Sequence, residues 1–147
     1  MTEPLPPAPP RWRPLLPYAG IAAVVGALGG AFAWTAGGLT PTRGFMALAA
    51  KSPIPVNAII RPRIGGFAYS DDEISIMLAD IEAACDAGLA GVVIGALRPD
   101  GTLDRAVLER LVKAAGTLDL TLHRAFDMVP DFDVAVEMAI DLGFSRV

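Results

Sequence analysis

The sequence contains very little cysteine and histidine. Cys85 is the only cysteine and His123 is the only histidine among 147 residues. A single thiol excludes an intramolecular disulfide and a Cys-rich zinc site built within the chain. Basic residues are outnumbered as well, because 12 Lys and Arg stand against 16 Asp and Glu. This acidic balance argues against a nucleic-acid-binding module, so no nucleic-acid partner is expected.

The beginning of the chain lacks charge. Met1–Pro10 holds five prolines, which indicates an extended leader that forms neither helix nor sheet. No charged side chain lies between Arg13 and Arg43. Within that stretch Leu15–Ala36 is long enough to cross a bilayer, for which about 20 apolar residues suffice. Its many Gly and Ala residues make it weakly hydrophobic, so we expect a helix without a definite docking surface, with membrane tethering or export as the alternative.

The composition and the apolar periodicity of the sequence change near Gly37, which predicts two parts. Residues 1–36 form the Pro-rich leader and the apolar Ala/Gly-rich segment. Residues 37–147 form the folded domain, in which a β-branched run, a polar loop and an amphipathic helix ending at glycine recur. The predicted strands are Ile54–Ile60, Gly91–Gly95 and Leu120–His123, and Arg146-Val147 is predicted to begin a fourth.

Three predicted helices follow these strands. The first begins at Ser70, which forms a capping box with Glu73, and it ends at Gly88. Cys85 lies on its apolar face, so we expect a buried and unreactive thiol. The second helix ends before Gly116 and has its apolar stripe at Val107, Leu108, Leu111, Val112 and Ala115. The third spans about Asp133–Leu142, with Val134, Ala135, Met138, Ala139 and Leu142 as its apolar stripe.

Strands that alternate with single helices predict an α/β fold with a parallel sheet, either doubly wound or closed into a barrel. The periodicity favours neither arrangement. Three and a half units are too few to close an eight-stranded barrel, which typically takes about 250 residues. We therefore expect a sheet with open edges that is poorly stable alone.

Polar residues gather where the predicted strands end, which is where the chemistry of such folds lies. Alternation along the strands places Arg61 and His123 on a polar face. Arg61, Arg63 and Arg124 are candidate substrate-binding residues, because arginine binds a carboxylate or phosphate bidentately. His123 and Asp127 are candidate catalytic residues, since histidine exchanges a proton near neutral pH. The alternative is that all five are structural, with Asp127 close enough to pair with Arg124.

Three blocks of sequence carry a resemblance to a known family. They read Arg61-Pro62-Arg63-x-Gly-Gly-Phe67-x-Tyr69-Ser70, Gly91-Val-Val-Ile-Gly95-Ala-Leu followed by Asp100-Gly101-x-Leu-Asp104, and His123-Arg124-Ala125-Phe126-Asp127. In this order and spacing they resemble the CutC family, named for copper homeostasis. The resemblance begins at about Gly37-Gly38-Leu39-Thr40-Pro41 and runs to Val147. It implies a TIM-barrel-like fold, a cytoplasmic location and copper as the bound ion.

The sequence also departs from the family. Family members lead into the Gly-Gly-Leu-Thr-Pro segment through an Arg-Ile-Glu-Leu-Cys-like stretch, whereas Ile21–Ala36 has no acid and no cysteine here. The later strands of the barrel are not in this sequence, so an incomplete barrel is predicted.

Two classes of function stay open. The resemblance implies a copper-handling protein, although Cys85, His123 and the methionines form no soft-ligand cluster at a recognised spacing, and no metal ligand is assigned. The strand-end residues point instead to an enzyme for a small anionic substrate carrying a phosphate or carboxylate.

Overall fold

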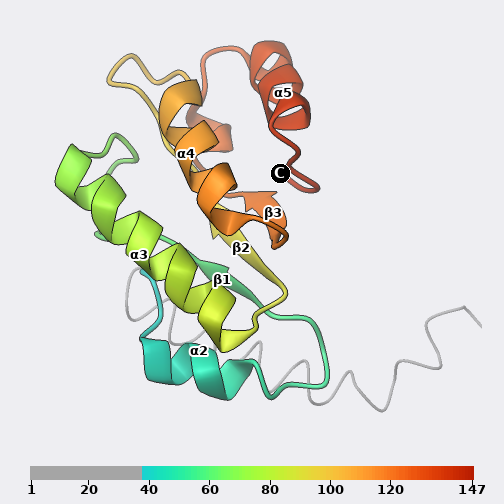
Figure 1. Ribbon diagram of the computed structural model, residues 1–147. Coiled ribbons are helices and arrows are strands. Elements are labelled where there is room, and N and C mark those ends of the chain that lie inside the picture. Colours follow the sequence, from blue (N-terminus) through green and yellow to red (C-terminus); the bar gives the residue numbers. More distant parts are fainter. Residues whose placement is uncertain (1–37) are drawn as a thin grey trace, which may run out of the picture. The chain divides into compact units, whose positions relative to one another are not determined.

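Three parallel strands form the centre of the fold (Figure 1). The structure is a computed structural model that describes residues 38–147. Strands β1 (Asn57–Ile59), β2 (Gly91–Ile94) and β3 (Asp119–Leu122) lie side by side in the order of the chain. Helix α3 (Asp71–Ala87) connects β1 to β2, and α4 (Arg105–Ala115) connects β2 to β3. This alternation confirms the predicted α/β fold with parallel βα units. The remaining elements are α2 (Arg43–Ala49), the 3-10 helix η2 (Phe126–Met128) and α5 (Phe132–Asp141).

Local sequence signals set the ends of the helices. The Ser70 hydroxyl accepts a hydrogen bond from the Glu73 backbone N–H, and the Glu73 carboxylate accepts one from the Ser70 N–H, which is the predicted capping box. The same helix ends at Gly88, whose φ of 75° is left-handed and suits glycine. Asp104 and Asp131 cap α4 and α5 in the same way, each accepting from a backbone N–H three residues on.

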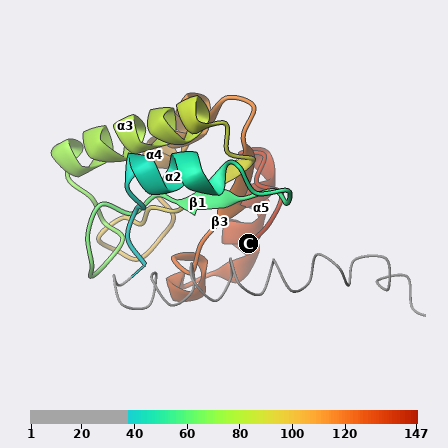
Figure 2. The ribbon, with the colours of Figure 1, turned by 90° about the horizontal axis from the view of Figure 1, so that it is seen from below.

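The two faces of the sheet differ. Helices α3 and α4 lie along the same side of the strands (Figure 2). Alternate strand residues belong to an apolar core with these helices. Its largest fully buried side chains are Met46, Ile60, Met77, Ile81, Ile94, Leu111 and Val92. A second apolar cluster, which includes Phe67, Leu108, Leu122 and Ala139, fills the space toward α5. The opposite face of the sheet carries the polar rows in which the candidate site lies.

A fourth strand begins at the end of the chain, as predicted. Arg146 forms a parallel bridge with Thr121, and the Leu122 N–H donates to the Arg146 carbonyl over 2.9 Å. The Ser145 N–H donates to the Leu120 carbonyl over 3.0 Å. Among the described residues the sheet is open, so the predicted incomplete barrel matches the observed arrangement.

Two predictions about the elements need correction. The first strand begins at Asn57 rather than at Ile54, because proline at positions 53 and 55 supplies no N–H for a ladder. Val134 was predicted to lie on the apolar stripe of the last helix, but it is 55% exposed. Only Ala135 and Ala139 of α5 are buried.

The leader at residues 1–36, and with it the helix expected at Leu15–Ala36, lies outside the described residues. Within residues 38–147 no helix has the length and apolar character needed to cross a membrane.

Candidate functional site

Arg61, Gly95 and His123 form one row across the C-terminal ends of the three strands. The register pairs Ile59 with Val93 and Val93 with Thr121. Because side chains alternate along a strand, the residues two positions further on lie on the same face. Arg61 and His123 therefore face the same side of the sheet, with a glycine between them, as the sequence predicted.

The glycine in the middle of this row makes room for the histidine ring. A Cβ on Gly95 would lie 2.5 Å from Nδ1 and Cε1 of His123, so the imidazole lies directly over the strand. Phe67, from the loop after β1, contacts both His123 and Arg61. Its ring centroid is 4.7 Å from that of His123 and 4.9 Å from Cζ of Arg61. The three side chains thus form one continuous group, in which a cation contacts an aromatic ring.

His123 is only 8% exposed, and it is uncharged at neutral pH. Burial is the main cause that lowers its pKa to about 4; a hydrogen bond with its own backbone opposes the shift, and the positive charges of Arg61 and Arg124 support it. Its Nδ1 accepts a hydrogen bond from the Ala125 N–H over 3.2 Å. The expectation that His123 exchanges a proton near neutral pH is therefore wrong in this environment, because a ring with this pKa stays neutral there.

Arg61 is held at the base of its side chain by a segment far away in the sequence. Its backbone N–H donates to Oγ1 of Thr40 over 2.8 Å, and its carbonyl accepts from the Thr40 N–H over 3.0 Å. Its guanidinium donates to the Gly65 carbonyl over 2.6 Å. These contacts fix the direction of the side chain, while the guanidinium remains near the ring of Phe67.

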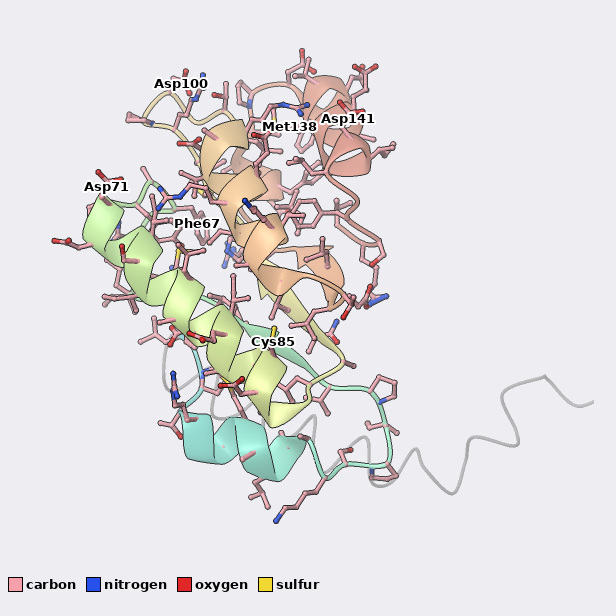
Figure 3. The ribbon with its side chains drawn as sticks, in the orientation of Figure 1. Phe67, Asp71, Cys85, Asp100, Met138 and Asp141 are labelled. Carbon is pink, nitrogen blue, oxygen red and sulfur yellow. The ribbon has the colours of Figure 1, made fainter. Side chains whose placement is uncertain are left out.

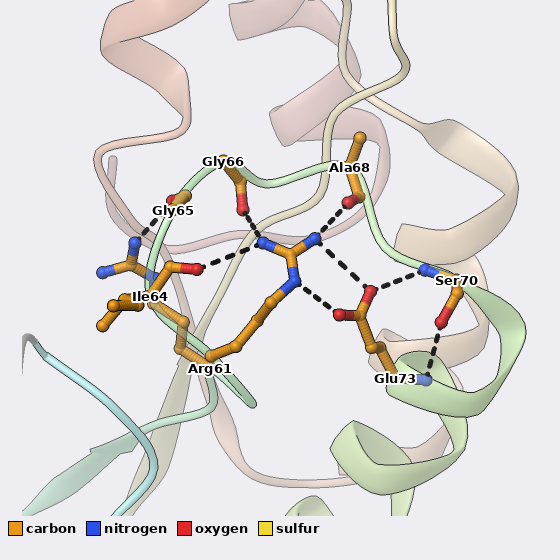
Figure 4. Close-up of polar contacts among 8 residues, drawn as sticks. Arg61, Ile64, Gly65, Gly66, Ala68, Ser70 and Glu73 are labelled. Carbon is orange, nitrogen blue, oxygen red and sulfur yellow. Dashed lines mark hydrogen bonds and ion pairs between the residues drawn. The ribbon is translucent and has the colours of Figure 1, made fainter.

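Arg63 does not join this group, which corrects the prediction that three arginines converge. Its guanidinium forms an ion pair with Glu73. Glu73 lies beside Ser70 at the start of α3 (Figure 4). The Arg63 guanidinium also donates to the carbonyls of Gly66 over 2.8 Å and Ala68 over 2.6 Å. Glu73 in turn caps α3, and its pKa is lowered chiefly by the hydrogen bond from Arg63. Arg63 therefore ties the loop to the helix.

Arg124 and Asp127 lie just beyond β3 and are exposed. Arg124 is close enough for its charge to lower the pKa of His123. The Asp127 backbone N–H donates to the Arg124 carbonyl over 3.1 Å, but no ion pair joins their side chains in the described part of the chain. The group thus holds Arg61, His123 and Arg124, and within residues 38–147 no hydrogen bond or ion pair brings the Asp127 carboxylate into it.

Cys85 lies at the other end of the domain and is exposed, so the prediction of a buried thiol is wrong. Figure 3 shows Cys85 in the C-terminal part of α3, whereas Phe67 lies near the beginning of that helix. The thiol reaches the Ala115 carbonyl at 4.0 Å, where α4 ends and the chain turns at Gly116, so its outer side stays uncovered.

The donor set in residues 38–147 does not fit a copper ion. No group of three or more His, Cys, Asp and Glu side chains in that range is arranged to hold a metal. Copper(I) prefers thiolate and thioether ligands. The sulfurs of Met46 and Met77 lie in the apolar core, and Cys85 and His123 belong to opposite ends of the sheet.

Thr40, Phe67 and Tyr69 also belong to this region. The periodicity of the predicted strands does not indicate a role for them. Burial raises the pKa of Tyr69, while the charges of Arg61 and Arg63 oppose the rise. Phe67 and Tyr69 fall in the first of the blocks that carry the family resemblance, and Thr40 falls in the segment where the resemblance begins. The signal that could have found them was therefore the shared block and not the strand periodicity.

Comparison with known proteins agrees with this architecture. A sequence model described as the CutC family matches residues 23–147, beginning ahead of Gly37. A family protein CutC from Rhizobium meliloti (strain 1021) is 56% identical over 112 residues, which is 76% of this chain and 46% of that protein. One from Vibrio vulnificus (strain YJ016) is 54% identical over 114 residues, with 76% and 46% covered.

A solved structure is similar as well. The crystal structure of CutC from Streptococcus agalactiae, described as a candidate copper homeostasis protein, matches with a TM-score of 0.73 and 35% identity. The match covers 76% of this chain and 56% of that one. The chain spans about half the length of the curated relatives it matches. With parallel βα units like those of the solved structure and a family match over most of its residues, the chain belongs to the CutC family.

Proposed function

We propose that the C-terminal ends of the strands bind a small anionic molecule that carries a carboxylate or phosphate group. The observation that carries this proposal is the row in which Arg61 and His123 face the same side across Gly95, with Arg124 nearby. Arginine recognises both anions through paired N–H donors. In this proposal residues 37–147 contribute the anion-binding part of a barrel. If the protein is an enzyme, the bound anion is its substrate.

The local charge supports an anion rather than a cation. Arg61 and Arg124 both lower the pKa of His123, which means that their positive charges reach the ring. Asp127 and Arg124 form no ion pair in the described residues, so that carboxylate does not cancel the charge by direct contact. Asp127 remains a candidate catalytic residue whose role would require it to turn toward the bound molecule.

Titration of the whole chain with inorganic phosphate and with acetate tests this proposal. Loss of one charge-assisted hydrogen bond costs about 1.5–3 kcal/mol, so Arg61→Gln and Arg124→Gln should each weaken binding roughly 10- to 150-fold. Arg124→Gln is the safer variant, because the side chain is exposed and its loss leaves the fold intact. Arg110→Gln, an exposed arginine on α4, is the matched control and should bind as the unchanged protein does.

Two outcomes of this titration would contradict the proposal. If the folded protein binds neither anion, or if Arg124→Gln and Arg110→Gln bind equally well, the arginines at the strand ends are structural.

We also propose a role in copper homeostasis, which rests on family membership and on the description of the Streptococcus agalactiae relative. Since the described donors do not fit a copper ion, the proposed role does not require copper to bind at the strand ends. Titration with copper(I) against a competing chelator tests this. If copper(I) binds stoichiometrically and His123→Asn abolishes the binding, copper binds at the strand ends and this part of the proposal is wrong. If the variant binds copper(I) as the unchanged protein does, copper is held elsewhere, as proposed.

A further inference from the structure

The protonated nitrogen of His123 is fixed by the fold. The Ala125 N–H donates to Nδ1 of the ring, so Nδ1 must present a lone pair and carry no proton. In a neutral imidazole the proton then resides on Nε2. Burial keeps the ring neutral, as do the charged groups that face it, Arg61 just after β1 and Arg124 in the loop after β3; Gly95, just after β2, carries no charge, and a hydrogen bond with the backbone of His123 itself acts in the opposite direction. In this tautomer Nε2 carries the proton and is an N–H donor.

This donor is buried without a hydrogen-bond partner in the described residues. Nε2 of His123 is inaccessible to solvent, and the residue as a whole is 8% exposed. A buried donor that makes no hydrogen bond is unfavourable, and such groups are rare in native structures. Here the other side of the ring is fully engaged, through the Nδ1 bond and the contact with Phe67. The one unsatisfied atom of the ring therefore belongs to the group that also contains Arg61.

We propose that His123 acts as a neutral Nε2–H donor to an oxygen of the bound anion, and that it is not a general base. The inference rests on the proposed anion site and deepens it by naming the class of ligand atom. An oxygen acceptor beside Arg61 satisfies the unpaired N–H and at the same time meets the positive charge. A metal ion does neither, because a protonated Nε2 has no lone pair to offer.

The burial of Nε2 adds a requirement for movement. Phe67 is 5% exposed and its ring lies against that of His123. Because Nε2 is inaccessible to solvent, an oxygen atom reaches it only when a neighbouring group shifts. The loop after β1 contains Gly65 and Gly66, both exposed; Arg63 holds the Gly66 carbonyl, and Phe67 packs in the second apolar cluster.

Nuclear magnetic resonance of the ¹⁵N-labelled whole chain tests the tautomer without a ligand. His123 is the only histidine, so the imidazole region contains a single ring. We expect a protonated-type shift at Nε2 and an unprotonated-type shift at Nδ1, unchanged between about pH 5.5 and 8. Averaged shifts at the two nitrogens, or a titration midpoint near the ordinary value of about 6.5, would overturn the inference.

Two substitutions test the contact with the anion. His123→Asn keeps an acceptor where Nδ1 was but removes the donor, whereas His123→Gln carries an amide N–H near the position of Nε2. With inorganic phosphate as the probe, the Asn variant should bind about tenfold more weakly or worse, and the Gln variant should stay within about threefold of the unchanged protein. The Nε2–H resonance should shift as phosphate saturates the unchanged protein.

The possible failures are distinguishable. If the unchanged protein binds neither phosphate nor acetate, the proposed function fails. If it binds them and the Asn variant binds equally well, the anion site stands and the donor role of His123 is overturned.

Discussion

Removing the titration of His123 should change how folding stability depends on pH. The folded ring has a pKa of about 4, whereas an unfolded histidine titrates near its ordinary value of about 6.5. Between these values the unfolded chain binds a proton that the folded chain does not. Stability is therefore fully present above about pH 6.5 and is lost as the pH falls toward 4.

The size of the loss follows from the two pKa values. One unit of difference corresponds to about 1.4 kcal/mol, so the full effect of His123 is about 3 kcal/mol once both states are protonated. Between about pH 7.5 and pH 5, where the folded ring is still mostly neutral, the expected loss is about 2 kcal/mol. That is a large fraction of the free energy of unfolding of a small domain.

Urea unfolding of the whole chain at these two pH values measures the effect, with His123→Asn as the comparison. The variant retains an acceptor for the Ala125 N–H and has no ring to protonate. Glu73 and Asp100, whose pKa values are lowered by hydrogen bonds, lose their contributions only at lower pH, near and below their ordinary range. Carboxyl effects are also common to both proteins and cancel. If both proteins lose equal stability between the two pH values, the buried neutral ring is refuted.

Three further outcomes are expected. Gly95→Ala should lower the free energy of unfolding by about 1–3 kcal/mol in urea, because its Cβ would lie 2.5 Å from the imidazole, while Gly66→Ala, which meets nothing within 4 Å, should be neutral. Arg63→Lys should speed limited proteolysis of the loop after β1 nearly as much as Arg63→Gln, since one ammonium group cannot replace a guanidinium that contacts several acceptors; cleavage at the unchanged rate would contradict this. Cys85 should react with a thiol reagent in the folded protein, and Cys85→Ser should leave anion binding unchanged; a thiol that reacts only in urea would contradict its exposure.

Elements defined by local signals could be predicted from the sequence. The Ser70–Glu73 capping box and Gly88 fix the two ends of α3, and each depends on contacts within a few residues. The parallel sheet also followed from the alternation of strands and helices. Even the fourth strand at Arg146 was predictable, because its β-branched neighbour follows a helix-ending glycine as in the earlier units.

Properties that depend on the surroundings of a side chain could not be predicted in this way. Arg63 and Arg61 are two residues apart on the same loop, yet Arg63 turns to Glu73 because that carboxylate lies at the beginning of the next helix. The charge state of His123 depends on burial under Phe67 and on two nearby cations. Cys85 shares a face of α3 with buried residues, but it is exposed because its Sγ lies beside Ala115, the last residue of α4. Periodicity places a residue on a face without revealing what covers it.

Two glycines, Gly91 at the start of β2 and Gly95 just after its end, connect the fold to the site. Gly91 lies between Asn57 and Asp119, whose side chains meet at 3.5 Å, and Gly95 lies between Arg61 and His123. A side chain on the central strand would separate the outer two in both rows. Their absence lets polar groups from β1 and β3 approach across the sheet, so the polar character of this face depends on the central strand. At the C-terminal end the groups brought together are the cations and the proposed N–H donor, and the negatively charged oxygen that we propose as the ligand would satisfy both.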